Sequence, residues 1–490
     1  MRRNAVLSVM VALTGLTFAA HDTLAQGFGV YEHDACMMGR AGTGVAAPCS
    51  NASAIFVNPA GLVNAGAAQR WNVSAGLTLI SPSFTYQDSL TATTTNGVDN
   101  TIPVPNLYVV RQLGRFAHRY PWAVGIGVFA PYGLVSEWPS DFQGRFLGYR
   151  SELKSVNIQP TAAWQINHWL SFGAGFDYVR TTVDLKQRVD LSSNPVGSPL
   201  LPPGTTFAAL GVPVGTDFAD GHLTGASWSG TGHFGLLVTT DRVNVGVRYL
   251  MRGTADIQGD ANFSQVATGI LLPAGSPLQP AAKAYCPGVS APDDTLRAAA
   301  GLPLDDVLHC GAFSGSGPLT SQHASVPIAL PDQLILGTSI QATEKLRLLM
   351  DVQWVHWERF KELRLTFAKL PQRVLWEDYH NTTGVRLGAE YALMPKFTVR
   401  VGGLYHEGAA PAQTVTPLLP EAERSEATFG GTLHLGRNGQ LDFAYQRIWQ
   451  ADRRGRVVEP TVRGSAGTAV NTGLYGGSAT LLGANLSWRF

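Results

Sequence analysis

Four cysteines are the residues of this chain best suited to cross-linking or to binding a metal. Cys36 and Cys49 form one local group, and Cys286 and Cys310 form another. Neither spacing is a CxxC motif, and no histidine cluster completes a zinc site, so no metal and no cofactor are expected. We favour two local disulfides over free thiols. This chemistry requires export to an oxidising compartment.

Hydrolytic chemistry has no comparable support in the sequence. The 12 histidines are scattered, without the spacing to a serine and an acid that would indicate a hydrolase. The 36 basic side chains nearly balance the 35 acidic ones, which leaves no basic surface for nucleic acid. We therefore expect neither an enzyme nor a nucleic-acid partner.

Residues 1–25 have the pattern of a secretory signal peptide. Arg2 and Arg3 precede the apolar run AVLSVMVALTGLTFAA, and the small residues of TLA precede Gln26. The alternative is an N-terminal membrane anchor, which the shortness of the run and the lack of a stop-transfer pattern disfavour. Export agrees with the expected disulfides.

Alternating apolar and polar residues recur from residue 70 onward. At the end of the chain, Leu482, Ala484, Leu486, Trp488 and Phe490 occupy every second position. A period of two residues indicates strands with one apolar face. Charged residues make up only 14% of the chain, mean hydropathy is +0.03, and the polar faces are rich in glycine. This combination is typical of a membrane barrel with lipid outside and a polar lumen inside.

The number and spacing of these runs predict the topology. We count 14 runs in residues 70–490, an even number as bacterial barrels require. Short polar turns alternate with long segments near 191–221 and 264–322, which we expect to be extracellular loops. The fold class is therefore all-β: a 14-stranded antiparallel transmembrane β-barrel. The last strand must pair with the first, and the terminal Phe490 is expected to be read by the barrel-assembly machinery.

Residues 26–69 lack the alternation and are rich in alanine and glycine. A barrel of this size is too wide for its own side chains to fill, so we expect this segment to plug the lumen as an N-terminal hatch. A periplasmic tail is the alternative. It would leave Ile55, Phe56 and Val57 badly placed in water.

Several motifs resemble the FadL/TodX family over essentially the whole mature chain. They are the start Gly27-Phe28, GRAGTG at 39–44, NPAGL at 58–62, LPDQLILGTS at 330–339 and VHWERFKEL at 355–363. The resemblance implies an outer-membrane channel that passes long-chain fatty acids or aromatic hydrocarbons without an energy source. It assigns to the hatch Gly27, Phe28, Gly39, Arg40, Asn58, Pro59 and Ala60.

A strand break is predicted in VFAPYGLV. Pro131 lacks an N–H and Gly133 weakens strand pairing, which indicates a bulge or kink. The family uses a kink in its third strand as a lateral opening, so the candidate residues here are Ala130, Pro131, Tyr132 and Gly133. The alternative is a simple strand end near the loop side.

Ligand capture is expected at the two long loops, which are unusually apolar; mutual packing of these side chains is the alternative. The resemblance places a basic residue for a ligand carboxylate at Arg364, although alternation from Trp354 directs Arg364 outward unless a bulge intervenes.

The predicted function is passive transport of hydrophobic small molecules, long-chain fatty acids first, by loop capture, hatch-gated passage and lateral exit. The alternatives are aromatic hydrocarbons by the same route and a structural or adhesin barrel. A monomer in contact with outer-membrane lipid and lipopolysaccharide is expected.

Overall fold

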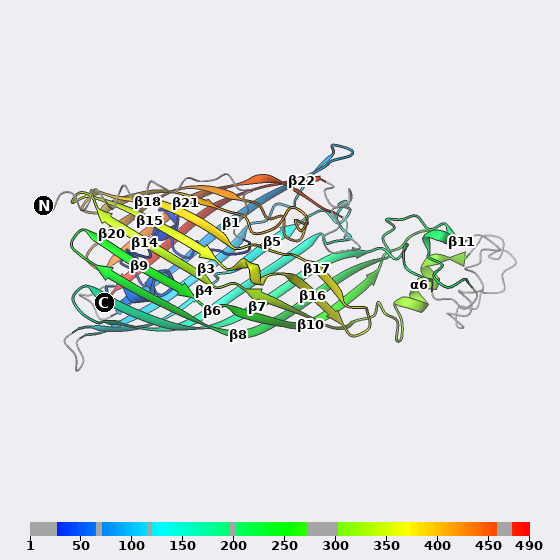
Figure 1. The fold of residues 1–490 in the computed structure, drawn as a ribbon, viewed down its shortest axis with the longest axis horizontal. Helices are drawn as coiled ribbons and strands as arrows, with labels where there is room; N and C mark the ends of the chain where they lie inside the picture. Colours follow the sequence, from blue (N-terminus) through cyan, green and yellow to red (C-terminus); the bar gives the residue numbers. More distant parts are fainter. Residues whose placement is uncertain (1–26, 65–70, 115–119, 197–200, 273–301, 458–472) are drawn as a thin grey trace.

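The computed structural model describes residues 27–64, 71–114, 120–196, 201–272, 302–457 and 473–490 (Figure 1). The predicted signal peptide and Cys286 lie outside the described residues, so the signal peptide and the pairing of Cys286 with Cys310 stay predictions.

The strands form one closed antiparallel barrel, which confirms the predicted fold class of 14 strands. The continuous strands are β1 (Trp71–Asp88), β3 (Ile102–Gly114), β6 (Arg150–Gln165), β7 (Leu170–Val189), β8 (Ala219–Thr239), β19 (Phe397–His406), β20 (Arg424–Leu435), β21 (Gly439–Gly455) and β22 (Gly473–Arg489). The others cross in two pieces: β4 (Trp122–Phe129) with β5 (Gly133–Glu137), β9 (Val243–Leu250) with β10 (Gly253–Gln265), β13 (Gln322–Leu330) with β14 (Gln333–Gln341), β15 (Leu346–Val355) with β16 (Glu362–Phe367), and β17 (Arg373–Trp376) with β18 (Thr382–Met394).

The first and last strands close the barrel. β1 pairs with β22 from Asn72 opposite Arg489 to Asp88 opposite Gly473. The backbone of Phe490 also exchanges hydrogen bonds with that of Trp71, at N···O distances of 3.1 and 2.9 Å. The chain ends on an alternating strand because that strand completes the sheet. The role of Phe490 in assembly stays a prediction.

The interior changes character along the barrel axis. Around the hatch the inward side chains are polar, whereas toward the loops they form a large apolar cluster. Bulges produce the change: in β14 the even-numbered Leu334 and Leu336 face outward, whereas in β13 the even-numbered Val326 and Ile328 are buried inside. The apolar alternation continues through the break while the face that it occupies reverses.

The hatch lies inside the barrel, toward the end at which the C-terminus is marked (Figure 1, dark blue). It contains α2 (Ala35–Met38), α3 (Ala54–Val57) and the 3₁₀ helix η1 (Pro59–Asn64). All of α2 and α3 is buried, including the apolar residues that a free tail would have exposed. Within the described segments, no helix has the length and apolar character needed to cross a bilayer.

The loop end is partly ordered by its own apolar contacts. The 3₁₀ helix η2 (Ala208–Leu210), α6 (Leu304–Ala312) and the short β11 (Leu271–Leu272) and β12 (Leu302–Pro303) belong to this end. Phe218, Leu272 and Leu308 share a buried cluster there. The first long loop is predicted at 191–221, but β8 already begins at Ala219, so the loop ends before that residue. A further strand, β2 (Thr94–Asn96), extends β1 as a hairpin.

This closed hydrogen-bonded sheet predicts heat-modifiable behaviour. Because long ladders close the sheet around the barrel, the folded protein in detergent is expected to resist SDS without heating and to migrate faster than the boiled form. Its far-UV circular dichroism should be dominated by strand. Equal migration of the heated and unheated samples, or a helical spectrum, would contradict the barrel.

Candidate functional site

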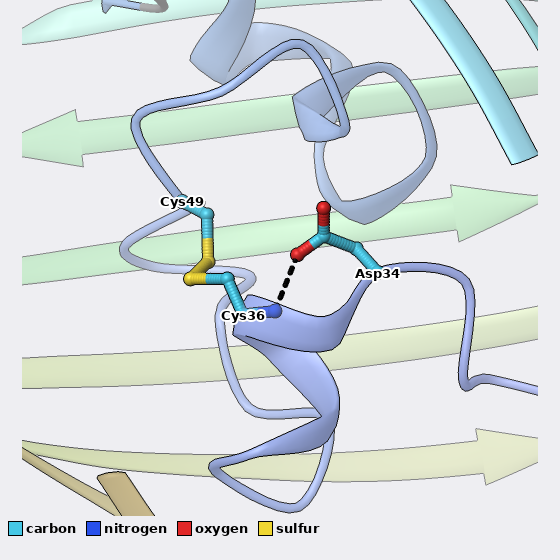
Figure 2. A group of neighbouring side chains, drawn as sticks. All are labelled: Asp34, Cys36 and Cys49. Atoms are coloured by element: carbon cyan, nitrogen blue, oxygen red, sulfur yellow. Dashed lines mark hydrogen bonds between the residues drawn. A yellow bond between two sulfur atoms is a disulfide. The ribbon is translucent and has the colours of Figure 1, made fainter. Parts of the chain in front are cut away.

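A disulfide joins two segments of the hatch (Figure 2). Cys36 and Cys49 are bonded with their Cα atoms 6.5 Å apart, and Asp34 accepts a hydrogen bond from the Cys36 backbone N–H at 2.8 Å. Together these three side chains bring potential metal ligands within reach of one another. The sulfurs are bonded to each other, however, and Asp34 also accepts from Asn51 Nδ2 at 2.8 Å. The group is therefore a structural cross-link.

Asp34 also has a structural role. Burial, together with the nearby charge of Asp442, raises the pKa of this carboxyl. Its hydrogen bonds to Cys36 and Met37 cap α2. The role that the contacts support is to hold the start of the hatch in shape.

Asn58 fastens the hatch to the barrel wall. Its Nδ2 donates to the carbonyls of Val45 at 2.7 Å and Leu236 at 3.0 Å, and its Oδ1 accepts from the Ala60 N–H at 3.1 Å. A Cβ atom on Gly235 of β8 would lie 2.0 Å from Asn58 Oδ1. The turn at 58–60 thus rests directly on the backbone of the wall, where any larger residue would displace it.

We expect the replacement Asn58→Ala to loosen the hatch while the barrel still assembles. The change removes the Asn58 partner from the buried Val45 carbonyl, the buried Ala60 N–H and the partly buried Leu236 carbonyl. Leaving a buried polar group without its partner costs about 1–3 kcal/mol. Amide hydrogen exchange in residues 35–64 should therefore accelerate, and uptake of ligand should be lost. Pro59→Ala should act in the same direction, because the proline ring fixes the φ of residue 59, directly after Asn58.

Asn167→Ala is the matched control for this prediction. Asn167 Oδ1 accepts from the N–H groups of Trp169 and Leu170, both at 2.9 Å, in a short turn outside the hatch. This variant should leave hatch exchange and uptake unchanged. Unaltered uptake in both Asn58→Ala and Pro59→Ala would count against a plug role.

The GRAGTG segment packs just as tightly. Arg40 is buried, donates from Nη2 to the Ala47 carbonyl at 2.7 Å and pairs with Glu390 of β18 at 3.4 Å. Burial lowers the pKa of this guanidinium to about 10, which still leaves it charged at neutral pH. A Cβ atom on Gly39 would lie 3.0 Å from the backbone of Gly430 in β20, so glycine allows the close approach.

The third strand breaks where the sequence predicts it. β4 ends at Phe129 and β5 begins at Gly133. The N-terminal segment occupies the break: the Val30 N–H donates to the Pro131 carbonyl at 2.9 Å, and the Gly133 N–H donates to the Phe28 carbonyl at 3.0 Å. Residues 28–30 therefore pair with the kink through an isolated antiparallel bridge between Gly29 and Tyr132, and this contact couples the hatch to the wall.

The wall has a gap beside this kink. β3 pairs with β4 only from Leu107 to Gly114, and β5 pairs with β6 from Gly133 opposite Lys154 to Glu137 opposite Arg150. Among the described strands, no pairing joins β5 to β3. The gap ends toward the loops where the Val98 N–H donates to the Glu137 carbonyl at 2.8 Å.

Two prolines that we did not single out from the sequence line the edge of this gap. Pro103 and Pro105 are two residues apart in β3, so their missing N–H groups would face the same neighbour. β3 keeps its register with β1 through both positions, which indicates that the missing donors face away from β1. The pattern IPVPNL could have predicted this edge from the sequence, because two prolines in one strand are expected only where the strand has no partner on that side.

A cavity of about 250 Å³ lies at this gap. Leu153 and Ser155 reach it from the inward face of β6, whereas Lys154 and Val156 reach it from the outward face. The cavity is mostly apolar. It is therefore lined from both sides of the wall, and its other lining residues include Gly27, Gly29, Val30, Ile80, Pro103, Pro105, Ala130, Tyr132, Gly133, Leu134, Val135 and Leu481.

Two smaller apolar cavities, each about 40 Å³, continue from this one toward the loops. The first shares Leu134 and Leu153 with the wall cavity, and Phe28 lies in its lining. The second shares Leu365 and Leu375 with the first. The three cavities thus form one series of apolar spaces, from the loop half of the interior to the outer face of the barrel.

Phe28 lines the first of the two smaller cavities, and its neighbours Gly27, Gly29 and Val30 line the wall cavity. Its ring packs edge-on against Trp357 and Phe360, with centroids 4.8 and 5.6 Å away, and lies 6.0 Å from Tyr132. The preceding Gly27 donates its N–H to Glu421 at 2.8 Å. Its φ of +60° and its contact with the Trp357 ring leave no room for a side chain.

Arg364 lies away from these cavities. It is on the outward face of β16, about half exposed, and donates to Glu362 at 3.0 Å and Gln372 at 3.2 Å. Simple alternation therefore holds in this strand. The position of Arg364 does not support the carboxylate contact that the family resemblance implies. The cationic side chains that do line the cavities are Lys154, Lys186, Arg373 and Arg424. No motif distinguished them in the sequence.

Comparison with known proteins agrees with this architecture. Residues 16–490 match the model of the family "Outer membrane protein transport protein (OMPP1/FadL/TodX)". The long-chain fatty acid transport protein of Escherichia coli K12 is 23% identical, over 95% of this chain and 94% of that protein. Outer membrane protein P1 of Haemophilus influenzae is 25% identical, over 97% and 98%.

Solved structures share the fold. A Pseudomonas aeruginosa FadL homologue aligns with a TM-score of 0.73 at 18% identity, covering 95% of this chain and 100% of that one. The Pseudomonas putida toluene transporter TodX aligns with a TM-score of 0.62 at 17% identity, covering 95% and 100%. From the match over nearly its whole length, this chain belongs to the OMPP1/FadL/TodX family of outer-membrane transport proteins.

Proposed function

We propose that this protein is a passive channel that takes hydrophobic small molecules from the cell exterior and releases them sideways into the outer membrane. The ligand first binds among the apolar loops, then moves through the inner cavities past Phe28, and leaves through the gap beside β5. The observation that carries this proposal is the cavity lined from both faces of β6.

Lateral release avoids a large energetic cost. Moving an acyl chain into water costs about 25 cal/mol for each Å² of apolar surface, or several kcal/mol for a whole chain. The apolar cavities and the lipid outside the gap form a route along which this transfer is unnecessary. The hatch supports the route by filling the axial path, where inward side chains are polar and a greasy ligand would bind poorly.

Long-chain fatty acids are the proposed ligand class. An elongated series of apolar spaces suits a chain. Lys154, which pairs with Glu152, and Arg373, which donates to Gln187, carry positive charge near each end and can also receive a carboxylate. Relatives named as long-chain fatty acid transport proteins agree with this assignment. Aromatic hydrocarbons by the same route are the second candidate, because solved toluene transporters share the fold.

Ligand retention by the purified protein tests the assignment. Radiolabelled oleate should be retained far better than toluene, and the double replacement Lys154→Gln with Arg373→Gln should weaken oleate alone. Arg364→Gln is the matched control, because Arg364 carries the same charge on the outer face. Preferential retention of toluene, unaffected by either change, would favour the hydrocarbon. Retention of neither ligand would reject the channel.

A further inference from the structure

The outer face of the barrel marks where the membrane ends. Along β9 the outward residues Val243, Val245 and Tyr249 are apolar or aromatic and exposed. After the break, the outward positions of β10 become polar, beginning with Thr254 and continuing through Asp256 and Gln258. A membrane strand needs about 9–11 residues to cross the bilayer. The lipid boundary on this side therefore lies near Met251 and Arg252.

Three neighbouring strands bend at this level. Leu250 pairs with Gln333, and Gly253 pairs with Leu330, so residues 251–252 lie opposite 331–332. Gln333 also pairs with Val355, and the following His356 N–H donates to the Asp332 carbonyl at 3.0 Å. The bends of β9, β14 and β15 therefore bring their outward side chains together at the membrane surface.

Asp332 organises these side chains. Its Oδ1 accepts from Arg359 Nε at 3.2 Å and lies 3.0 Å from His356 Nδ1, while its Oδ2 accepts from the Tyr249 hydroxyl at 3.3 Å. Asp332 is nearly buried, whereas Arg359 is about one-third exposed. One carboxylate thus holds Tyr249, His356 and Arg359 together in one cluster.

Donor groups remain available in this cluster. Arg359 bonds through Nε, and its two Nη groups have no hydrogen-bond partner among the described residues. Arg252 is exposed and makes no ion pair with any described residue, and it lies in the two-residue break opposite 331–332, beside Asp332. Two guanidinium groups therefore face outward at the lipid boundary.

We propose that Arg252 and Arg359 bind the phosphate of a phosphorylated lipid in the outer leaflet. A guanidinium presents paired N–H groups that match phosphate oxygens, and it loses less on leaving water than an ammonium does. Tyr249 and Trp354 lie just below, at the level where aromatic residues contact headgroups. The exposed Leu336 farther down the wall offers apolar surface to the acyl chains. The occupant is a membrane lipid, since apolar wall and cationic cluster adjoin.

This site is on the outer face of the barrel, where β9, β14 and β15 are separated from β5 by β6, β7 and β8. On the inside the two regions touch, because the Tyr132 hydroxyl donates to the Pro331 carbonyl at 3.0 Å and Trp357 packs against Phe28. Lipid binding is therefore measured directly and not through uptake, so failure of either proposal would be recognised separately.

Equilibrium binding of a fluorescent bis-phosphorylated lipid A to the detergent-solubilised full chain tests the site. The double replacement Arg252→Gln with Arg359→Gln should weaken binding at least about tenfold, because hydrogen bonds to charged groups are lost. Arg364→Gln is the matched control and should bind as the unmodified protein does. Dephosphorylated lipid A should bind the unmodified protein about as weakly as phosphorylated lipid A binds the double variant. Unboiled migration on SDS gels verifies that each variant is folded.

Two outcomes would overturn the proposal. Equal binding of phosphorylated lipid A by the folded double variant and the unmodified protein would show that these arginines are not the site. Displacement of the lipid by micromolar inorganic phosphate would show a site for the free anion instead.

Discussion

Uptake of hydrophobic ligand should fall at least about tenfold when substitutions allow the strands on either side of the wall gap to pair. A tenfold fall corresponds to about 1.4 kcal/mol added to the barrier for passage. The variant carries Pro131→Ala and Gly133→Val in the kink, with Pro103→Thr and Pro105→Thr in β3. These changes restore N–H donors at both edges and add β-branched residues, which favour continuous strands. A Cβ atom on Gly133 would meet Val30 at 3.4 Å, so the kink itself has room.

The change should not weaken the barrel or the binding of ligand. New backbone pairs replace unpaired groups at the lipid boundary, so resistance to SDS should be at least preserved. Retention of oleate should survive because the loops and inner cavities are untouched, and the ligand should remain trapped inside. Pro160→Thr is the control, since Pro160 is an outward proline that already pairs with Ile126 in a regular ladder. Unchanged uptake with a structurally regular third strand would reject lateral exit in favour of a path through the hatch.

Local chemistry made part of this wall predictable from the sequence. Pro131 and Gly133 are visible as obstacles to pairing, and the described strand ends on each side of them. The closing pair of β1 and β22 is also predictable, because alternation up to Phe490 requires a partner and an even-numbered barrel offers the first strand. In these cases individual residue types show whether the backbone of a strand can pair with a neighbour.

The other breaks could not be read in this way. Residues 242–263 appear as one alternating run, yet they form β9 and β10, with a break at Met251 and Arg252 where the register against β8 shifts by one residue. Outside the membrane the barrel exterior meets water and its interior holds apolar surface, so the apolar face must turn from outside to inside. A single extra residue accomplishes that reversal without interrupting the alternation. The apolar cavities near the loops were therefore hidden, because the pattern alone does not say which face is inward.

The hatch contacts were predictable only in kind. The sequence indicates a small-residue plug, but the pairing of residues 28–30 with the kink joins segments about one hundred positions apart, and no local pattern encodes it. Lys154 illustrates the same limit for the ligand site. It continues the outward face of β6, and only the missing neighbour of β5 makes it part of a cavity.

The replacement Phe28→Ala should speed the release of bound ligand. The Phe28 ring is buried beside Trp357 and Phe360 and lines the inner cavity, and the adjacent Gly27 and Gly29 line the wall cavity. Truncating a buried phenylalanine costs about 3–5 kcal/mol, and this loss weakens the local contact of the N-terminal segment with the kink. The two cavities would then merge, so the energy barrier between them should fall. The measurement is the dissociation rate of radiolabelled oleate from the protein in lipid vesicles.

Phe56→Ala separates this effect from a general loss of packing. Phe56 is a buried hatch phenylalanine as well, but it packs against His33 and Phe129, with centroids 4.2 and 5.0 Å away, and does not line the wall cavity. It should reduce hatch stability by a similar amount and leave the release rate of oleate nearly unchanged. Faster release in Phe28→Ala alone would identify the N-terminal segment as the barrier between the cavities. Equal release rates in the two variants would mean that ligand passes elsewhere, because the Phe28 ring would then stabilise the hatch without controlling the movement of ligand.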